Sequence, residues 1–186
     1  GTPLGTLGHF GTYSFHETKN IISGEGGALL INDERFIERA EMIREKGTDR
    51  SKFFRGQVDK YTWKDVGSSY LPGEVIAAFL WAQMEEAQQI TSKRLAIWSF
   101  YHQALAPLAM TGKLRLPIVP EECCHSAHMY YLIMPSLGSR TRIMAQLKAD
   151  NIQSVFHYVP LHDSEYGAQH GRAHANLPIT RMASDR

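Results

Sequence analysis

The most informative segment of this sequence is Ser14-Phe15-His16-Glu17-Thr18-Lys19-Asn20, followed after three residues by Gly24-Glu25-Gly26-Gly27. A β-like run at residues 9–15 leads into this stretch, and Ala28-Leu29-Leu30-Ile31 leads out of it. Two strands around a polar, glycine-rich loop are therefore the simplest prediction.

The side chains of this loop are suited to carbonyl chemistry. Lys19 has a hydroxyl, an imidazole and glycines as neighbours, and an amine forms an imine only after losing its proton. Partial burial beside another cation lowers a lysine pKa enough for this. Ser14 is suited to donating to a phosphate oxygen, and the glycines let the backbone approach a flat cofactor. Taken alone the pattern is weak, because most lysines in polar loops are solvated and Gly-Glu-Gly-Gly more often forms a turn.

Helical patterns follow the loop. Asn32 or Asp33 is suited to capping a helix that runs to about Lys46, with Gly47 as its stop. Residues 48–66 lack a clear period and are predicted to form an ordered loop.

A second helix is predicted to begin near Pro72, to continue through Leu105 and to end at Pro107. Its length is several times that of an average helix, and such a helix usually connects two domains or lines a subunit interface. Beyond it, residues 128–134 and 153–159 read as strands on either side of a helix capped by Ser139. This order predicts a small α+β domain.

Composition narrows the classes of function. The 186 residues are 43% hydrophobic and 21% charged, with a net charge of +1, which gives no electrostatic reason to expect nucleic acid or an anionic membrane as a partner. Cys123 and Cys124 are adjacent, and the histidines lack metal-ligand spacing, so neither a disulfide framework nor a metal site is predicted. Reduced thiols favour a cytoplasmic location. Both ends of the sequence read as internal to a longer protein.

The stretch from Ser14 to Asn20 and the glycines at 24, 26 and 27 resemble the cofactor-lysine signature of the DegT/DnrJ/StrS sugar aminotransferases, with serine, histidine, lysine and the glycines in register. The resemblance extends over essentially the whole chain. Residues 44–50, 53–63 and 155–162 are similar to the branch of this family that acts on a dTDP-linked 4-keto-6-deoxy sugar.

This resemblance implies an α/β protein with fold type I of the pyridoxal 5'-phosphate (PLP) enzymes, working as a homodimer with shared active sites. Residues 1–72 would then be the C-terminal part of a large cofactor-binding domain. Residues 73–110 would form a connecting helix, and residues 111–186 a truncated small domain.

The resemblance also implies roles for individual residues. Lys19 would hold the cofactor covalently and move the proton during transfer of an amino group from glutamate to the C4 keto group of the sugar. The residues expected to contact the cofactor are Ser14, His16, Lys19 and Ser69, and those expected to line the sugar-nucleotide pocket are His157, Tyr158 and His162. Surface-polysaccharide synthesis is the pathway implied.

Two alternatives stay open at this point. One is the family's PLP-dependent sugar dehydratase branch, in which histidine replaces the lysine, so Lys19 argues against it. The other is a homologue without catalytic activity. The family's aspartate for the pyridinium nitrogen would precede Lys19 by more residues than the sequence contains. These residues alone are therefore expected to be nearly inactive.

Overall fold

The computed structural model describes residues 1–186, which form two compact units. The first contains Gly1–Leu95 and Glu121–His128, and the second contains Ala96–Pro120 and Met129–Arg186. The first unit holds both strands and helices α1 to α3, and the second holds helices α5 to α7. The protein is thus a mixed α/β chain with its sheet in the first unit.

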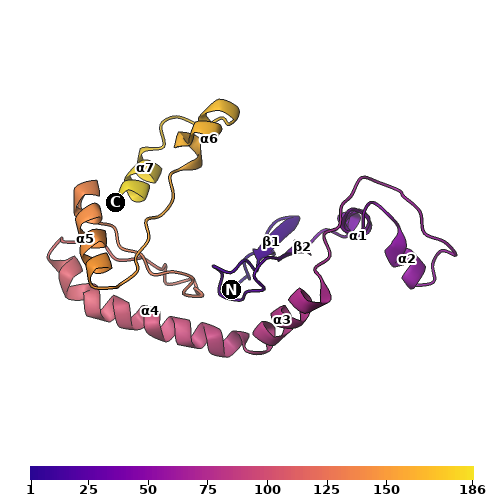
Figure 1. Ribbon diagram of the computed structural model, residues 1–186, viewed down its shortest axis with the longest axis horizontal. Coiled ribbons are helices and arrows are strands. Elements are labelled where there is room, and N and C mark those ends of the chain that lie inside the picture. Colours follow the sequence, from indigo (N-terminus) through magenta and orange to yellow (C-terminus); the bar gives the residue numbers. More distant parts are fainter. The chain divides into compact units, whose positions relative to one another are not determined.

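Strands β1 (Phe10–Ser14) and β2 (Gly27–Ile31) form an antiparallel hairpin, which confirms the two predicted strands (Figure 1). The register pairs Phe10 with Ile31 at one end and Ser14 with Gly27 at the other. Ser14 and Gly27 therefore form the last pair before the loop that carries Lys19. A close approach of Gly11 to the Gly5 carbonyl, which leaves no space for a Cβ atom, packs the N-terminal segment on β1.

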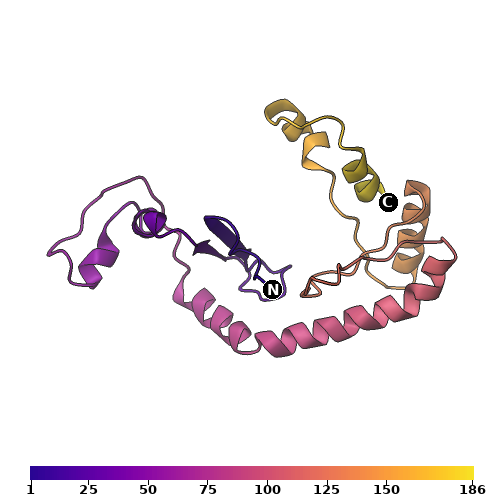
Figure 2. The ribbon, with the colours of Figure 1, turned by 180° about the vertical axis from the view of Figure 1, so that it is seen from behind.

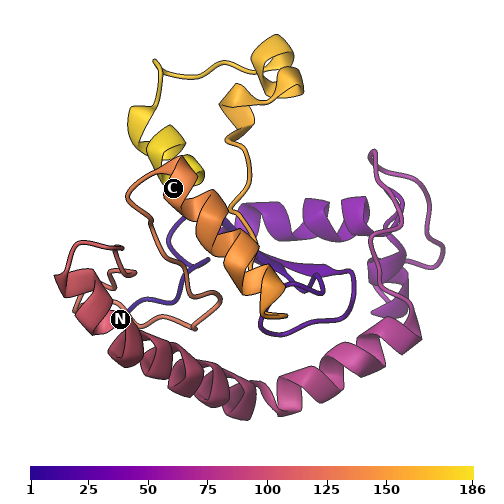
Figure 3. The same cartoon turned by 60° about the vertical axis from the view of Figure 1, so that its left-hand side comes forward.

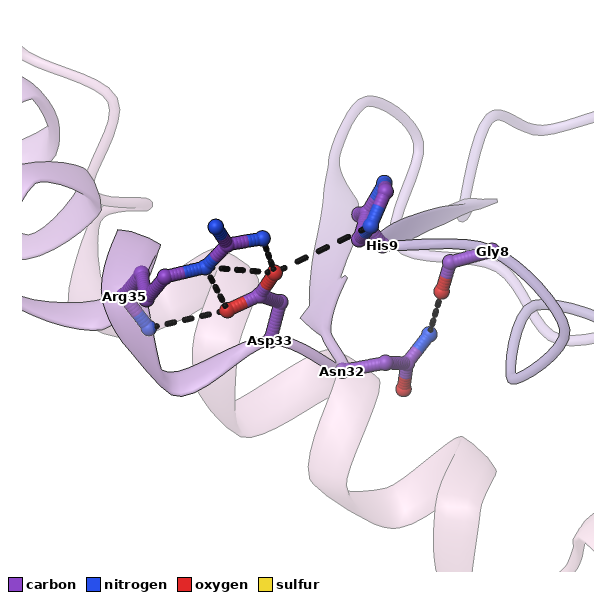
Figure 4. Close-up of polar contacts among 5 residues, drawn as sticks. All are labelled: Gly8, His9, Asn32, Asp33 and Arg35. Carbon is purple, nitrogen blue, oxygen red and sulfur yellow. Dashed lines mark hydrogen bonds and ion pairs between the residues drawn. The ribbon is translucent and has the colours of Figure 1, made fainter.

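Asp33 caps the helical segment that follows, as predicted. Its carboxylate accepts a hydrogen bond from the Arg35 backbone N–H at 3.1 Å and also pairs with the Arg35 guanidinium and with His9 (Figure 4). The first turn, η1 (Glu34–Phe36), is a 3₁₀ turn that continues into α1 (Ile37–Arg44). Asn32, the other predicted cap, instead donates to the Gly5 and Gly8 carbonyl oxygens at 2.9 and 2.8 Å.

Residues 45–70 pack against the C-terminal end of α1. The prediction of a loop over 48–66 was incomplete, because the short helix α2 (Arg50–Phe54) lies within it. Thr48 and Asp49 are buried, and the Asp49 carboxylate accepts the Thr62 backbone N–H at 2.7 Å. These hydrogen bonds order the segment, although its sequence has no hydrophobic periodicity from which the order could be predicted.

The predicted single long helix is two helices, α3 (Glu74–Glu85) and α4 (Ala87–Met110), so that prediction was wrong (Figure 2). The break falls at Glu86, which is the C-cap of α3, and its backbone N–H donates to the Met84 carbonyl. Pro107 does not end α4 but lies in its final part. Only one backbone hydrogen bond is lost there, since proline lacks its own N–H.

The second unit contains α5 (Leu137–Ala149), η2 (Leu161–Asp163), α6 (Glu165–His170) and α7 (Pro178–Asp185) (Figure 3). Ser136, not Ser139, caps α5, and the Ser139 N–H donates to the Ser136 hydroxyl at 3.1 Å. The strands predicted at 128–134 and 153–159 do not form. A strand requires a neighbour for its backbone groups, and the only pairing found is an isolated bridge between Arg115 and Ile133.

The chain buries little apolar surface. Ala127 is its one buried hydrophobic side chain, whereas Val75 and Trp81 on α3 are 82% and 68% exposed. A composition that is 43% hydrophobic is ordinary for a protein with a sizeable core, but these residues do not form one among themselves. No helix has the length and apolar character needed to cross a membrane.

Candidate functional site

The predicted site residues fall in both units. Ser14, His16, Lys19 and Ser69 belong to the first unit, and His157, Tyr158 and His162 belong to the second. Within the first unit, the structure brings Ser14, His16 and Lys19 together in the loop that connects β1 to β2.

Backbone hydrogen bonds across the hairpin give this loop a defined conformation. The Phe15 N–H donates to the Gly26 carbonyl at 2.8 Å, and the Glu17 N–H donates to the Gly24 carbonyl at 2.9 Å. The Lys19 N–H then donates to the His16 carbonyl at 2.9 Å, which closes a turn just before the lysine. Lys19 is partly buried as a result.

His16 has a fixed role in the loop. Its Nδ1 accepts the Thr18 backbone N–H at 3.2 Å and also lies 2.9 Å from the Thr18 hydroxyl. Since Nδ1 is an acceptor, the ring proton of neutral His16 is on Nε2, which lies 3.7 Å from the Glu25 carboxylate. His16 therefore ties the residues before Lys19 to the glycine segment after it.

Ser14 occupies the end of β1. Its Oγ accepts the His16 backbone N–H at 3.4 Å, so the hydroxyl proton stays available for another acceptor. The side chain is exposed. Beyond it, Gly24 has φ +83° and open space where a Cβ would lie, and this leaves the backbone accessible on that side of the loop.

Three further residues beside Lys19 were not selected from the sequence. The Asn20 side chain donates to the Ser126 carbonyl at 2.6 Å and lies 3.1 Å from Nδ1 of His128. Arg94 donates to the Ala127 and His128 carbonyls at 3.2 and 2.6 Å. Because Asn20 and His128 are 108 positions apart, no spacing rule could have joined them.

Burial lowers the pKa of the His128 imidazole, and the nearby cations Lys19 and Arg94 lower it further. The charge of Lys19 therefore acts on a histidine to which the sequence analysis gave no functional role. Only the folded structure brings the two side chains near each other.

Ser69 lies away from this loop, beside the end of α1. It pairs with Glu45 in an isolated antiparallel bridge, and its neighbours Ser68 and Tyr70 make backbone bonds to Ile43 and Arg44 at 3.0 and 3.1 Å. The Ser69 side chain is exposed.

In the second unit, His157 and Tyr158 are exposed, and their carbonyl oxygens are near the Ser184 hydroxyl of α7, at 3.4 and 2.7 Å. His162 is mostly covered, and its Nε2 lies 3.5 Å from the Asp163 carboxylate. Arg181 pairs with this carboxylate at 2.7 Å through Nε and lowers the pKa of Asp163.

The residues of the β1–β2 loop fit both reactive ends of PLP. A partly buried primary amine matches the aldehyde, and a serine hydroxyl with a free proton matches the phosphate. The open face at Gly24 leaves space for a flat ring. No group of three or more His, Cys, Asp or Glu side chains is arranged to hold a metal ion.

A lysine loop of this kind on an α/β chain defines a class, the PLP-dependent transferases of fold type I. The chain belongs, within this class, to the DegT/DnrJ/EryC1/StrS aminotransferase family, whose sequence pattern matches residues 1–186. Aminotransferases of this family depend on PLP, and a similar protein of Streptococcus pneumoniae has been solved in PLP and PMP forms.

Two curated relatives and one solved structure illustrate the similarity. The chain is 25% identical over 167 residues to the dTDP-4-dehydro-2,3,6-trideoxy-D-glucose 4-aminotransferase of Saccharopolyspora spinosa, covering 87% of this chain and 43% of that protein. It is 28% identical over 169 residues to the GDP-perosamine synthase of Caulobacter vibrioides, covering 87% and 42%. The sugar aminotransferase CalS13 of Micromonospora echinospora superposes with a TM-score of 0.83 at 21% identity, covering 100% of this chain and 47% of that one. The chain therefore spans less than half the length of the proteins it matches.

Proposed function

We propose that the protein is a PLP-dependent aminotransferase that adds an amino group to the keto carbon of a nucleotide-linked sugar. The observation that carries this proposal is the position of Lys19, partly buried in a bonded loop with Ser14 and His16. Membership of a sugar aminotransferase family over residues 1–186 supports it.

Each residue of the loop has a task in this proposal. Lys19 would hold the cofactor through its amine and, as a free amine, would accept and return a proton. Ser14 would donate its hydroxyl proton to the cofactor phosphate. His16 keeps the loop closed through Thr18 and Glu25, and so fixes the direction from which the lysine approaches. When bound, PLP supplies the electron sink for the reaction.

The finer proposal concerns the substrate. We propose a dTDP-4-keto-6-deoxyhexose as the acceptor, glutamate as the donor and dTDP-4-amino-4,6-dideoxygalactose as the product, for surface-polysaccharide synthesis in the cytoplasm. One relative is named for a dTDP sugar and another for a GDP sugar, so these names support the nucleotide-sugar class. The choice of dTDP rests on the resemblance of residues 53–63 and 155–162.

The pocket for the sugar nucleotide is assigned to His157, Tyr158 and His162. The exposed side chains of His157 and Tyr158 are accessible to a ligand, and the buried Nε2 of His162 has no hydrogen-bond partner within the chain. Ser69 is assigned to the cofactor phosphate of a partner subunit in a homodimer. The exposure of its side chain supports this role.

The test is covalent trapping on Lys19. Incubation of the intact protein with PLP should produce visible absorbance, and borohydride should fix the cofactor on the peptide that contains Lys19. Lys19→Ala should abolish both the trapping and the transfer of the amino group. Lys93→Ala, a change at a lysine on α4 that contacts only Gln89, is the matched control and should leave both intact. Normal turnover by the Lys19→Ala protein would overturn the proposal.

A further inference from the structure

Residues 126–128 carry a strained backbone next to the lysine loop. Ala127 has φ +50°, a left-handed conformation that is unfavourable for a residue with a Cβ, and it is nevertheless the one buried hydrophobic side chain. Such strain persists only where the surrounding contacts impose it, and it is found most often at functional sites. Arg94 and Asn20 bind the carbonyls of Ala127 and Ser126, and the Ala127 N–H donates to Nδ1 of His125 at 3.3 Å.

The Asn20 amide determines which nitrogen of His128 is protonated. Its Nδ2 donates to the Ser126 carbonyl at 2.6 Å, so the amide cannot be turned over without bringing two oxygens together. Oδ1 is therefore the atom 3.1 Å from Nδ1 of His128, and because Oδ1 only accepts, Nδ1 must donate. In the neutral ring Nε2 is then the proton-free nitrogen.

The charges around His128 keep its ring neutral. Lys19 and Arg94 are the charged groups that act on it, and both are cations that lower its pKa below the ordinary value, in addition to the effect of burial. No carboxylate is among the groups that shift it.

We propose that His128 is a positioning residue of the lysine site, held by Asn20 as the Nδ1–H tautomer, and that this pair fixes the Lys19 loop on residues 126–128. The role of Lys19 in this inference rests on the function proposed above. The Asn20 and Arg94 contacts are called the Asn20 clamp below.

The first experiment needs no cofactor. Nitrogen NMR of the intact, histidine-labelled protein reports the tautomer and the pKa of His128, and His128→Gln assigns the signal. We expect the Nδ1–H tautomer, and we expect Lys19→Met to raise the pKa of His128 because a nearby cation is removed. Lys93→Met is the matched control and should leave that pKa unchanged, although Lys93 is adjacent to Arg94 on α4. An Nε2–H tautomer, or equal pKa values for wild type and Lys19→Met, would overturn the inference.

The second experiment uses the rate at which borohydride-trapped PLP appears on Lys19. His128→Leu removes the donor to Asn20 and should slow attachment about tenfold, the scale expected for one lost hydrogen bond. His128→Gln keeps an N–H donor and should restore the rate to within about threefold of wild type. Equal slowing by both variants would contradict a role for the hydrogen bond.

The two proposals can fail separately. If NMR shows that Lys19 affects the pKa of His128 but no PLP is trapped on Lys19, the inference about the Asn20 clamp stands and the proposed function fails. If PLP is trapped on Lys19 but Lys19 has no effect on the pKa of His128, the proposed function stands and the inference about the Asn20 clamp fails.

Discussion

Gly47, in the first unit, lies at a position where only glycine fits. It is buried at φ +76°, three residues beyond the end of α1 at Arg44, and a Cβ there would overlap the Asp65 carbonyl oxygen. Its own carbonyl accepts the Lys64 and Asp65 N–H groups at 2.7 and 3.0 Å. This close packing holds the segment that leads to Ser69.

Replacing Gly47 with alanine should therefore destabilise the protein strongly. We expect a loss of about 2–5 kcal/mol, because the left-handed backbone costs roughly 1–2 kcal/mol and the overlap about 1–3 kcal/mol more. Denaturant unfolding measures this loss.

Gly56→Ala is the matched control for this change. Gly56 also has positive φ, at +69°, but has open space where a Cβ would lie. The Gly56→Ala variant should lose only roughly 1–2 kcal/mol of its free energy of unfolding, which is the cost of the left-handed backbone conformation. Equal losses for the two variants would show that the contact with Asp65 does not matter.

An ion pair connects α1 to the residues after α2. Arg55 contacts the Glu41 carboxylate with both terminal nitrogens, at 2.9 and 2.7 Å, and this bidentate contact is the main reason that the pKa of Glu41 is lowered from its ordinary value of 4.5. A carboxylate with a lowered pKa binds fewer protons in the folded than in the unfolded state. Its stabilising effect is thus complete above pH 4.5 and is lost as the pH falls through the lowered value.

We therefore expect Arg55→Met to destabilise the protein at neutral pH, with the difference from wild type disappearing in acid. Unfolding by denaturant at a series of pH values from neutral downward measures this difference. Lys60→Met removes a cation that has no ion pair in the structure and should give a pH curve parallel to that of wild type. A difference between Arg55→Met and wild type that persists at the acid end would argue against the ion pair as its source.

The whole chain exposes apolar side chains that a folded protein normally covers. Val75 and Phe79 lie one turn apart on α3 and are 82% and 50% exposed. Exposed apolar surface of this kind promotes association.

The 186-residue chain, produced by itself, should therefore bind an apolar dye and associate as its concentration rises. The double variant Val75→Gln with Phe79→Gln should bind less dye and keep its helix content, as measured by fluorescence and circular dichroism. Loss of helix in this variant would show instead that the two side chains are packed in solution.

The local features of the fold could be predicted from the amino-acid sequence. Asp33 caps its helix, the glycine-rich loop joins two strands, and Ser14, His16 and Lys19 share that loop, because each of these depends on neighbours within a few positions. The family was also determined, since its motif lies in consecutive residues.

Contacts between distant residues were decided by the tertiary structure alone. The hydrogen bond between Asn20 and His128 spans 108 positions. The segments 128–134 and 153–159 were predicted as strands from their composition, but they form no more than the isolated bridge between Arg115 and Ile133. The physical reason is the same in each case. A sequence pattern shows what a residue is able to bond with, whereas the folded chain decides which partner lies within reach.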